Sequence, residues 1–277
     1  MSTVEQAGHG AGHGAEFDIG EMLAHHMVNS QELELPFVGI VHLPTLHLLG
    51  FDIPITKHLV WMWIASGLLV LFAVGIGSRS RLIPGRLQSI LESLVLFVRD
   101  DVAIPSMGEE DGRRWTPFLL TNFFFILICN SMGLFPYGSA ATGNISVTAA
   151  LALVTLVLIH VSGMIRHGLI GHWKNFIPHG LPIWMLPVGL LLFVIEVLGT
   201  GLKAMALAIR LFGNMIAGHM VILSFLGLIF ILGVAFAPIS VALALFNLLL
   251  ELLIVPLQAF VFTQLTALFI GMSLHGH

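Results

Sequence analysis

The stretch from Val194 to Met220 (VIEVLGTGLKAMALAIRLFGNMIAGHM) constrains the fold of this chain more than any other, because it places ionisable side chains inside a long apolar run. The four are Glu196, Lys203, Arg210 and His219. A charged side chain at the centre of a bilayer costs roughly 2.5–3.5 kcal/mol on insertion scales, and arginine stays protonated at any ordinary pH. An arginine kept at that cost indicates a fixed positive charge that serves a function.

The composition identifies the class of protein in which this stretch lies. Hydrophobic residues make up 57% of the chain and charged residues 9%, whereas a soluble domain has about 25% charged residues. We therefore predict an all-α polytopic membrane protein. A nucleic-acid partner is excluded, because no basic patch has aromatic residues interleaved with it. Cys129 is the single cysteine, so no intrachain disulfide can form. We expect no cofactor and no bound metal.

Apolar runs along the chain predict five membrane crossings, each long enough for about 30 Å of hydrocarbon. They cover residues 58–76, 115–135, 145–164, 183–232 and 239–271, approximately. Between the first two, Pro84 suits a helix start and an apolar stripe follows, which predicts an amphipathic helix on the membrane surface at about 84–101. The acidic stretch 100–114 is expected to be a solvated loop. Together these segments predict a single membrane domain, residues 57–277.

Residues 1–56 are expected to form an N-terminal tail and interfacial segment on the outer side of the membrane. Residues 1–16 are a low-complexity Gly/His/Ala tail, which favours a solvated segment over a metal site, because such a site needs ligands in a fixed geometry. Residues 17–31 are compatible with a short interfacial amphipathic helix. Residues 35–56 are interrupted by three prolines and predict an extended or interfacial segment.

The basic residues predict the orientation, because Lys and Arg of short loops collect on the cytoplasmic side. Six arginines lie between the first two spans: Arg79, Arg81, Arg86, Arg99, Arg113 and Arg114. Arg166 and Lys174 follow the third span, whereas the links at 136–144 and 233–238 carry no Lys or Arg. Five crossings with the N-terminus outside and the C-terminus in the cytoplasm satisfy every loop.

This orientation requires residues 183–232 to cross the membrane once. About fifty helical residues reach roughly 75 Å, more than twice the hydrocarbon thickness. A single crossing must therefore be steeply tilted, or kinked near Gly199 and Gly201. The alternative is two ordinary spans joined by a loop at 199–214, which would place Lys203 and Arg210 outside and reverse the C-terminus.

The polar residues of the long run follow a pattern. Glu196, Lys203 and Arg210 are spaced seven residues apart and drift only about 20° per step around a helix. Asn214 lies one turn beyond Arg210 on the same side. His219 is nine residues from Arg210, which turns it to the opposite face of a straight helix.

If the last two runs fold as an antiparallel hairpin with its tip near residue 235, two residues of the final run can be matched in depth to polar residues of the run before it. Residues whose numbers sum to about 470 then lie at similar depth. His219 matches Glu251, and Arg210 matches Gln258. Glu196 lies deeper, toward the cytoplasm. This arithmetic predicts depth and not contact.

Protonatable groups on both sides of a fixed charge are typical of an intramembrane proton path, since carboxylate and imidazole exchange protons near neutral pH. Structural alternatives exist, namely an ion pair of Glu196 with Lys203 and a packing hydrogen bond of His219 with Glu251. A different class is a self-contained secondary transporter or ion channel with Glu196, Lys203 and Arg210 as its substrate site. Such transporters often contain internal repeats, and none is visible here. The 14 histidines raise a metal permease as a third, weaker candidate.

The segment RLFGNMIAGH, residues 210–219, closely resembles the signature helix of subunit a of F-type ATP synthases. Four further segments are similar to that family: LIPGRLQSILE (82–92), PFLLTNFFFILICNSMGLFPYG (117–138), TGNISVTAALAL (142–153) and LLLELLIVPLQAFVFTQLTALFI (248–270). The resemblance covers most of residues 57–272.

The resemblance implies a membrane stator subunit with two offset half-channels, which carry protons to and from the carboxylates of a rotating ring of c subunits. Arg210 would then be the essential arginine that meets the deprotonated ring carboxylate. His219 and Glu251 would line the outer half-channel, although many bacterial members have the acid on the first helix and the histidine on the second. Glu196 would lie near the inner half-channel.

Other implications of the resemblance concern the complex. Asn214 and Gln258 would be polar residues beside the arginine, with Lys203 in a secondary role. The partners would be the c-ring, the peripheral stalk subunit b and the lipid bilayer, and the location a bacterial inner membrane. The chain has no GxxxxGK[ST] phosphate loop, so we expect a non-catalytic subunit.

Overall fold

The structure, a computed structural model, describes residues 32–35, 39–48, 51–77, 85–135, 138, 140–176 and 186–275. The tail predicted at 1–16 and the interfacial helix predicted at 17–31 lie outside the described residues. Five of the described helices are long and apolar enough to span a membrane. They are α2 (Lys57–Gly77), α5 (Glu109–Gly133), α6 (Ile145–His167), α8 (Leu186–Leu232) and α9 (Ala237–His275). The predicted all-α polytopic fold is confirmed.

Two short β-hairpins precede the first membrane helix. Strand β1 (Glu32–Leu35) pairs antiparallel with β2 (Gly39–His42), and β3 (Thr45–Leu48) pairs antiparallel with β4 (Phe51–Pro54). The extended segment predicted from the prolines of this region is therefore folded into pairs of strands.

The region between α2 and α5 is more helical than its sequence predicts. Helix α3 (Arg86–Leu96) continues into the π-helix η1 (Phe97–Ala103) and the short α4 (Ile104–Met107), and only Gly108, at φ 81°, separates α4 from α5. The prediction of a solvated loop at 100–114 is wrong. Val98, Val102 and Met107 are buried in the main core, and the acids of the first turn of α5 suit the positive end of the helix dipole.

The last two helices form a long antiparallel hairpin. Its turn is Gly233, at φ 85°, followed by the 3₁₀ turn η4 (Val234–Phe236). Helix α8 has 47 residues without a break, which corresponds to about 70 Å. The alternative of two spans with a loop at 199–214 is therefore excluded.

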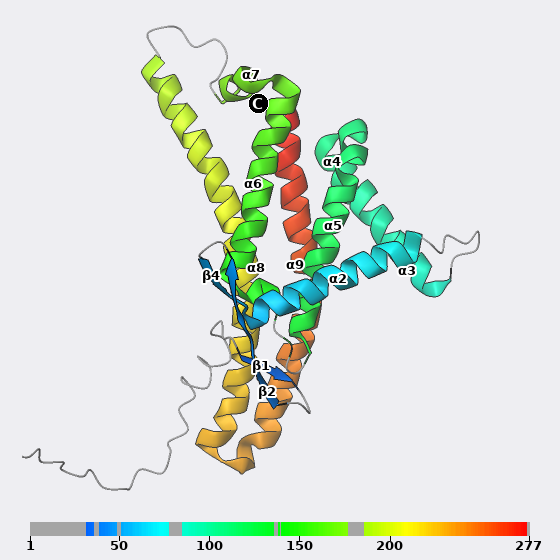
Figure 1. Cartoon of the computed structure of the whole chain (residues 1–277), viewed down its shortest axis with the longest axis vertical. Coiled ribbons are helices and arrows are strands. Elements are labelled where there is room, and N and C mark those ends of the chain that lie inside the picture. Colours follow the sequence, from blue (N-terminus) through cyan, green and yellow to red (C-terminus); the bar gives the residue numbers. More distant parts are fainter. Residues whose placement is uncertain are drawn as a thin grey trace, which may run out of the picture.

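The arrangement of α2 explains how so long a hairpin fits a membrane. Figure 1 shows α2 running across the long axis that α5, α6, α8 and α9 share. Helix α2 has 21 residues, or about 30 Å, which equals the hydrocarbon thickness. If α2 follows the membrane normal, the α8–α9 hairpin lies steeply inclined to it.

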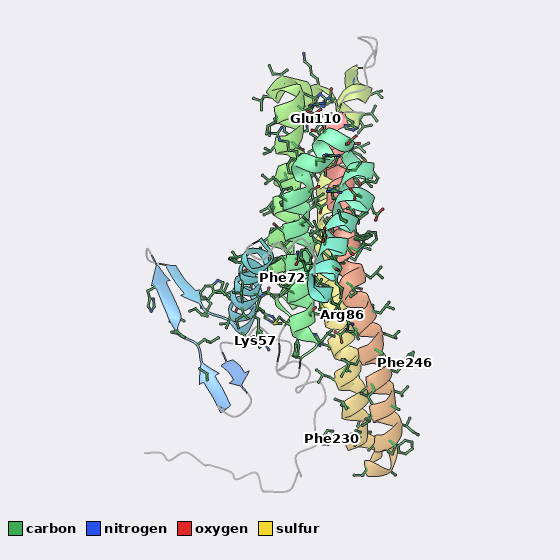
Figure 2. All side chains as sticks on the ribbon, turned by 90° about the vertical axis from the view of Figure 1, so that its right-hand side faces the viewer. Lys57, Phe72, Arg86, Glu110, Phe230 and Phe246 are labelled. Atoms are coloured by element: carbon green, nitrogen blue, oxygen red, sulfur yellow. The ribbon has the colours of Figure 1, made fainter. Side chains whose placement is uncertain are left out.

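The main core lies between α5, α6, α8, α9 and η1, and it includes Leu119, Ile126, Leu207, Leu211 and Phe262, each at most 2% exposed. The outer faces of the hairpin remain apolar and uncovered. Figure 2 shows Phe246 projecting from α9 near the hairpin tip, and its side chain is 60% exposed. Such a surface suits lipid or another apolar subunit.

Candidate functional site

Arg210 lies on the outer face of α8, between two buried anchors. Leu207 and Leu211 are 2% and 0% exposed and face the core, whereas Arg210 itself is exposed. Its guanidinium makes no hydrogen bond or ion pair with any residue that the structure describes. The helix therefore presents an uncompensated positive charge on the apolar surface of the protein.

One turn beyond Arg210, two amides connect the helices of the hairpin. Asn214 Nδ2 donates a hydrogen bond to Gln258 Oε1 at 2.7 Å. Asn214 is exposed and Gln258 is buried. The hairpin arithmetic matched Gln258 to Arg210 in depth, and the hydrogen bond goes to the residue one turn further along α8.

Glu251 and His219 face each other further toward the hairpin tip. His219 Nδ1 lies 3.9 Å from Glu251 Oε1. The Glu251 carboxyl group is 4% exposed, and neither of its oxygens has a hydrogen-bond partner among the described residues. A buried carboxylate without hydrogen bonds is costly to keep ionised.

A cavity of about 180 Å³ joins these two pairs, and Asn214, Glu251 and Gln258 line it. This volume has room for water. We name it the outer cavity. It also exposes Asn130 of α5 and Asn247 of α9, which the sequence reading did not place in the site. The signal for Asn247 was available, because it precedes Glu251 by one helical turn.

Close helix contacts at two glycines make room for the acid and the histidine. An added Cβ at Gly218 of α8 would meet Glu251 Oε1 at 2.8 Å. One at Gly133 of α5 would meet His219 Nε2 at 3.2 Å. Both side chains therefore pack directly onto a helix backbone.

On the other side of Arg210, Glu196 and Lys203 form a partly exposed ion pair. Lys203 Nζ lies 3.7 Å from Glu196 Oε1, with the two side chains 38% and 32% exposed. Lys203 Nζ also lies 5.9 Å from the centre of the Phe269 ring. We name the adjoining cavity of about 40 Å³ the inner cavity.

The wall of the inner cavity includes a residue that the sequence analysis did not assign to the site. His172 belongs to the short helix α7 (Leu169–Lys174) and lines this cavity together with Glu196 and Lys203. Its Nε2 is 3.1 Å from Nδ1 of His160 on α6. Burial lowers the pKa of His172, and the nearby His160 and His167 lower it further.

The structure thus divides the predicted residues into three places. Asn214, Gln258, Glu251 and His219 lie on and around the outer cavity, and Glu196 and Lys203 line the inner one. Arg210 lines neither cavity and lies between them along α8. Among the described residues, no group of three or more His, Cys, Asp or Glu side chains could hold a metal ion.

Comparison with known proteins identifies similar chains over almost the whole length. The family described as ATP synthase A chain matches residues 59–271. A protein named ATP synthase subunit a from Chloroherpeton thalassium is 44% identical over 269 residues, covering 91% of this chain and 79% of its own. Proteins of the same name from Myxococcus xanthus and Anaeromyxobacter dehalogenans are 48% and 40% identical, covering 82% and 99% of this chain and 77% and 76% of their own.

Proposed function

Because the chain belongs to the ATP synthase A chain family, we propose that it is the membrane stator subunit of a rotary F-type ATP synthase. In this role it carries protons through two half-channels to and from the carboxylates of a c-ring. It is a membrane component of that complex and converts ion flow to torque without catalysing nucleotide chemistry itself. The family match supports this function and not a self-contained transporter or channel.

The exposed guanidinium of Arg210 is the observation that carries the mechanism. It lies on a membrane helix, and no partner in the described part of the chain neutralises it. Because an isolated charge in hydrocarbon is expensive, we infer that another subunit supplies a negative group beside Arg210. A deprotonated carboxylate of the c-ring has the required charge and would meet Arg210 on the apolar face of the hairpin.

The outer cavity supports the entry half of the path. The Glu251 carboxyl oxygen and the His219 imidazole nitrogen lie 3.9 Å apart. Both groups can bind a proton, and the cavity has room for water that bridges them. The Asn214–Gln258 hydrogen bond lies between this pair and Arg210 in sequence position. Its amide groups can hydrogen-bond water molecules that carry the proton toward the ring.

The inner cavity supports the exit half. Glu196 lies there beside Lys203, which keeps a positive charge near the carboxylate. A proton released from the ring on this side passes to Glu196 and on to the cytoplasm. Arg210 separates the two half-paths, because its fixed charge repels a proton that would pass directly between them.

The remaining partners and the location follow from the same assignment. We assign the c-ring to the uncovered apolar face of α8 and α9, and the peripheral stalk subunit b to the surface of the same membrane domain. The location is a bacterial inner membrane. The positions of the basic loops support an N-terminus on the outside and a C-terminus in the cytoplasm.

Replacing Arg210 tests the function directly. Arg210→Ala is expected to abolish ATP synthesis driven by an imposed pH gradient in membrane vesicles, while the complex still assembles and co-purifies with its ring subunit. The matched control is Arg99→Ala, because Arg99 lies on η1, its side chain is 43% exposed, and it pairs with Asp100 at 2.7 Å. Near wild-type synthesis in the Arg210 variant would show that Arg210 does not separate the half-paths. Purification of an active transporter without any ring subunit would contradict the assignment to a synthase.

A further inference from the structure

A third cavity, of about 690 Å³, lies at the end of the bundle opposite the hairpin tip. The first turns of α5 and the last turns of α6 form its walls, and Leu274 near the end of α9 adjoins them. Figure 2 places Glu110, at the start of α5, at this end, and Phe230 at the other. The cavity shares no residue with the inner or outer cavity, and the proposed proton path does not use it.

Two arginines from different helices line this cavity. Arg114 comes from α5 and Arg166 from the last turn of α6. Both are exposed, and neither makes a hydrogen bond or ion pair with any described residue. One carboxylate, Asp111, shares the lining, which leaves a net positive charge.

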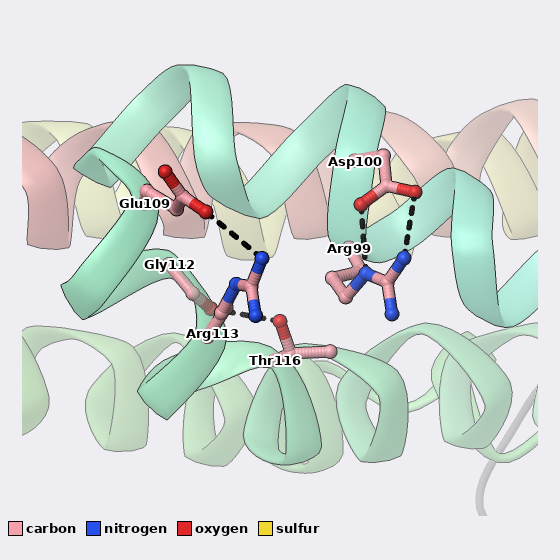
Figure 3. Close-up of polar contacts among 6 residues, drawn as sticks. All are labelled: Arg99, Asp100, Glu109, Gly112, Arg113 and Thr116. Carbon is pink, nitrogen blue, oxygen red and sulfur yellow. Dashed lines mark hydrogen bonds and ion pairs between the residues drawn. The ribbon is translucent and has the colours of Figure 1, made fainter.

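Two arginines nearby, in contrast, form ion pairs. Arg113, next to Arg114, pairs with Glu109 at 2.8 Å, and Arg99 pairs with Asp100 at 2.7 Å. Figure 3 shows both pairs. Of these four arginines, the two that line the cavity are therefore the two without a partner among the described residues.

The rest of the lining is apolar and aromatic. Trp115 and Phe118 contact each other edge-to-face with ring centres 6.0 Å apart. Ile165 is 71% exposed. Tryptophan is enriched where membrane hydrocarbon meets water. The cavity thus has a cationic part and an apolar part at one end of a membrane bundle, as an amphiphilic ligand requires.

We propose that this cavity binds one anionic phospholipid of the phosphatidylglycerol type. The planar guanidiniums of Arg114 and Arg166 match a phosphodiester in charge and in hydrogen-bond geometry. Basic pockets between membrane helices on the cytoplasmic side are known to hold anionic headgroups. The volume falls within the range of about 300–1,000 Å³ that is usual for small-molecule sites.

Asp111 and the apolar wall select among phosphate-bearing ligands. A headgroup near Asp111 must donate a hydrogen bond, which the hydroxyl groups of glycerol do and the choline group does not. An ethanolamine headgroup also donates but carries no net charge, whereas the lining has an excess of one positive charge. Inorganic phosphate has no acyl chain to cover Trp115, Phe118 and Ile165.

Photo-crosslinking tests the site in the intact complex. Phosphatidylglycerol with a diazirine in its acyl chain is added to the purified complex, irradiated, and mapped by peptide mass spectrometry. Label is expected on the first turns of α5 and the last turns of α6. Arg114→Gln and Arg166→Gln should each reduce this label about fivefold, and the double variant about twenty-five-fold. Arg113→Gln removes the same charge one residue away and should leave the label unchanged.

Further variants and probes distinguish this lipid from other ligands of the cavity. Arg114→Lys with Arg166→Lys keeps both charges and should retain most of the label, and co-purification of the other subunits shows that each variant is folded. Undiminished label in the double Gln variant would overturn the proposal, as would equal labelling by a phosphatidylcholine probe. Displacement of the probe by inorganic phosphate, or crosslinks from these turns to an acidic segment of another subunit, would also overturn it. The readout is lipid labelling, so it does not depend on proton flux through Arg210.

Discussion

The outer and inner cavities hold the same chemical group in opposite electrostatic surroundings. In the outer cavity, Glu251 is 4% exposed, and its oxygens have no hydrogen bond in the described part of the chain. In the inner cavity, the Glu196 side chain is 32% exposed and lies 3.7 Å from the ammonium group of Lys203. The outer cavity is also the larger, at about 180 Å³ against about 40 Å³.

This difference suggests a division of labour between the two half-paths. A buried carboxyl group with no fixed cation beside it favours its neutral form, so it is suited to receive a proton. The partly exposed Glu196 carboxyl group has access to solvent beside Lys203, so in the proposed function it is suited to pass a proton on toward the cytoplasm. In the proposed function, Arg210 keeps the two groups from exchanging protons directly.

Among the variants that test the difference between the two cavities, a Glu251 substitution should reduce proton-driven ATP synthesis the most. Glu251→Gln keeps the shape of the side chain and removes the carboxyl group proposed to take up the proton. We expect proton-driven ATP synthesis to fall on the order of a hundredfold, the lower end of what positioned proton-transfer groups contribute. Flux in reconstituted vesicles, measured with a pH-sensitive dye in each direction, checks the result. An unchanged flux and pH profile would remove Glu251 from the path.

Replacing Lys203 should reduce proton-driven ATP synthesis much less. The pair with Glu196 is partly exposed, and such pairs contribute only about 0.2–1 kcal/mol. Lys203→Gln is therefore expected to slow synthesis roughly two- to fivefold, and Lys203→Arg to restore most of the rate. A loss as large as that of Glu251→Gln would break the comparison, because it would make the inner pair as indispensable as the outer acid.

The hairpin could be predicted from sequence because helix geometry is regular. A fixed rise per residue and a turn near residue 235 set the depth of every side chain, so the sequence matches His219 to Glu251 and Arg210 to Gln258. The structure adds the contacts themselves. Asn214 rather than Arg210 donates a hydrogen bond to Gln258, which a match in approximate depth does not decide between residues one turn apart.

What could not be predicted depends on packing between distant segments. Stretch 100–114 is rich in charge, yet much of it is helical, because α9 packs against it. Gln264 Nε2 donates a hydrogen bond to Ser106 Oγ at 3.3 Å, and the Phe97 and Phe260 rings lie 5.5 Å apart. The contribution of Asn130 to the outer cavity is of the same kind, since only the placement of α5 beside α8 brings it there.

A glycine substitution tests whether the position of the Glu251 carboxyl group in the outer cavity limits proton entry. In Gly218→Ala the new methyl group would lie 2.8 Å from Glu251 Oε1, so the carboxyl group must move. Because that group is the end of a flexible side chain, we expect assembly to be unaffected and proton uptake from the outside to slow a few-fold. Gly213→Ala is the matched control, since nothing lies within 4 Å of its added Cβ. Equal rates in the two variants would mean that the position of the Glu251 carboxyl group does not limit proton entry.

The smallest predicted effect concerns the inner side, where α7 places His172 in the cavity wall. Burial lowers the pKa of His172, as do His160 and His167, so the folded state binds its proton less tightly than the unfolded chain, whose histidine pKa is about 6.5. The packing of α7 is therefore fully stable above about pH 6.5 and weakens as the pH falls below this value toward the lowered pKa. Hydrogen exchange of residues 169–174, corrected for the intrinsic pH dependence, should show protection decreasing from pH 7 to pH 5, while a peptide from the buried part of α5 stays protected. In His172→Phe, which keeps a buried ring and removes the titrating group, this pH dependence should disappear. If wild-type protection stays flat over the same range, His172 does not make the inner wall sensitive to acid, and the two cavities differ only in their carboxylates.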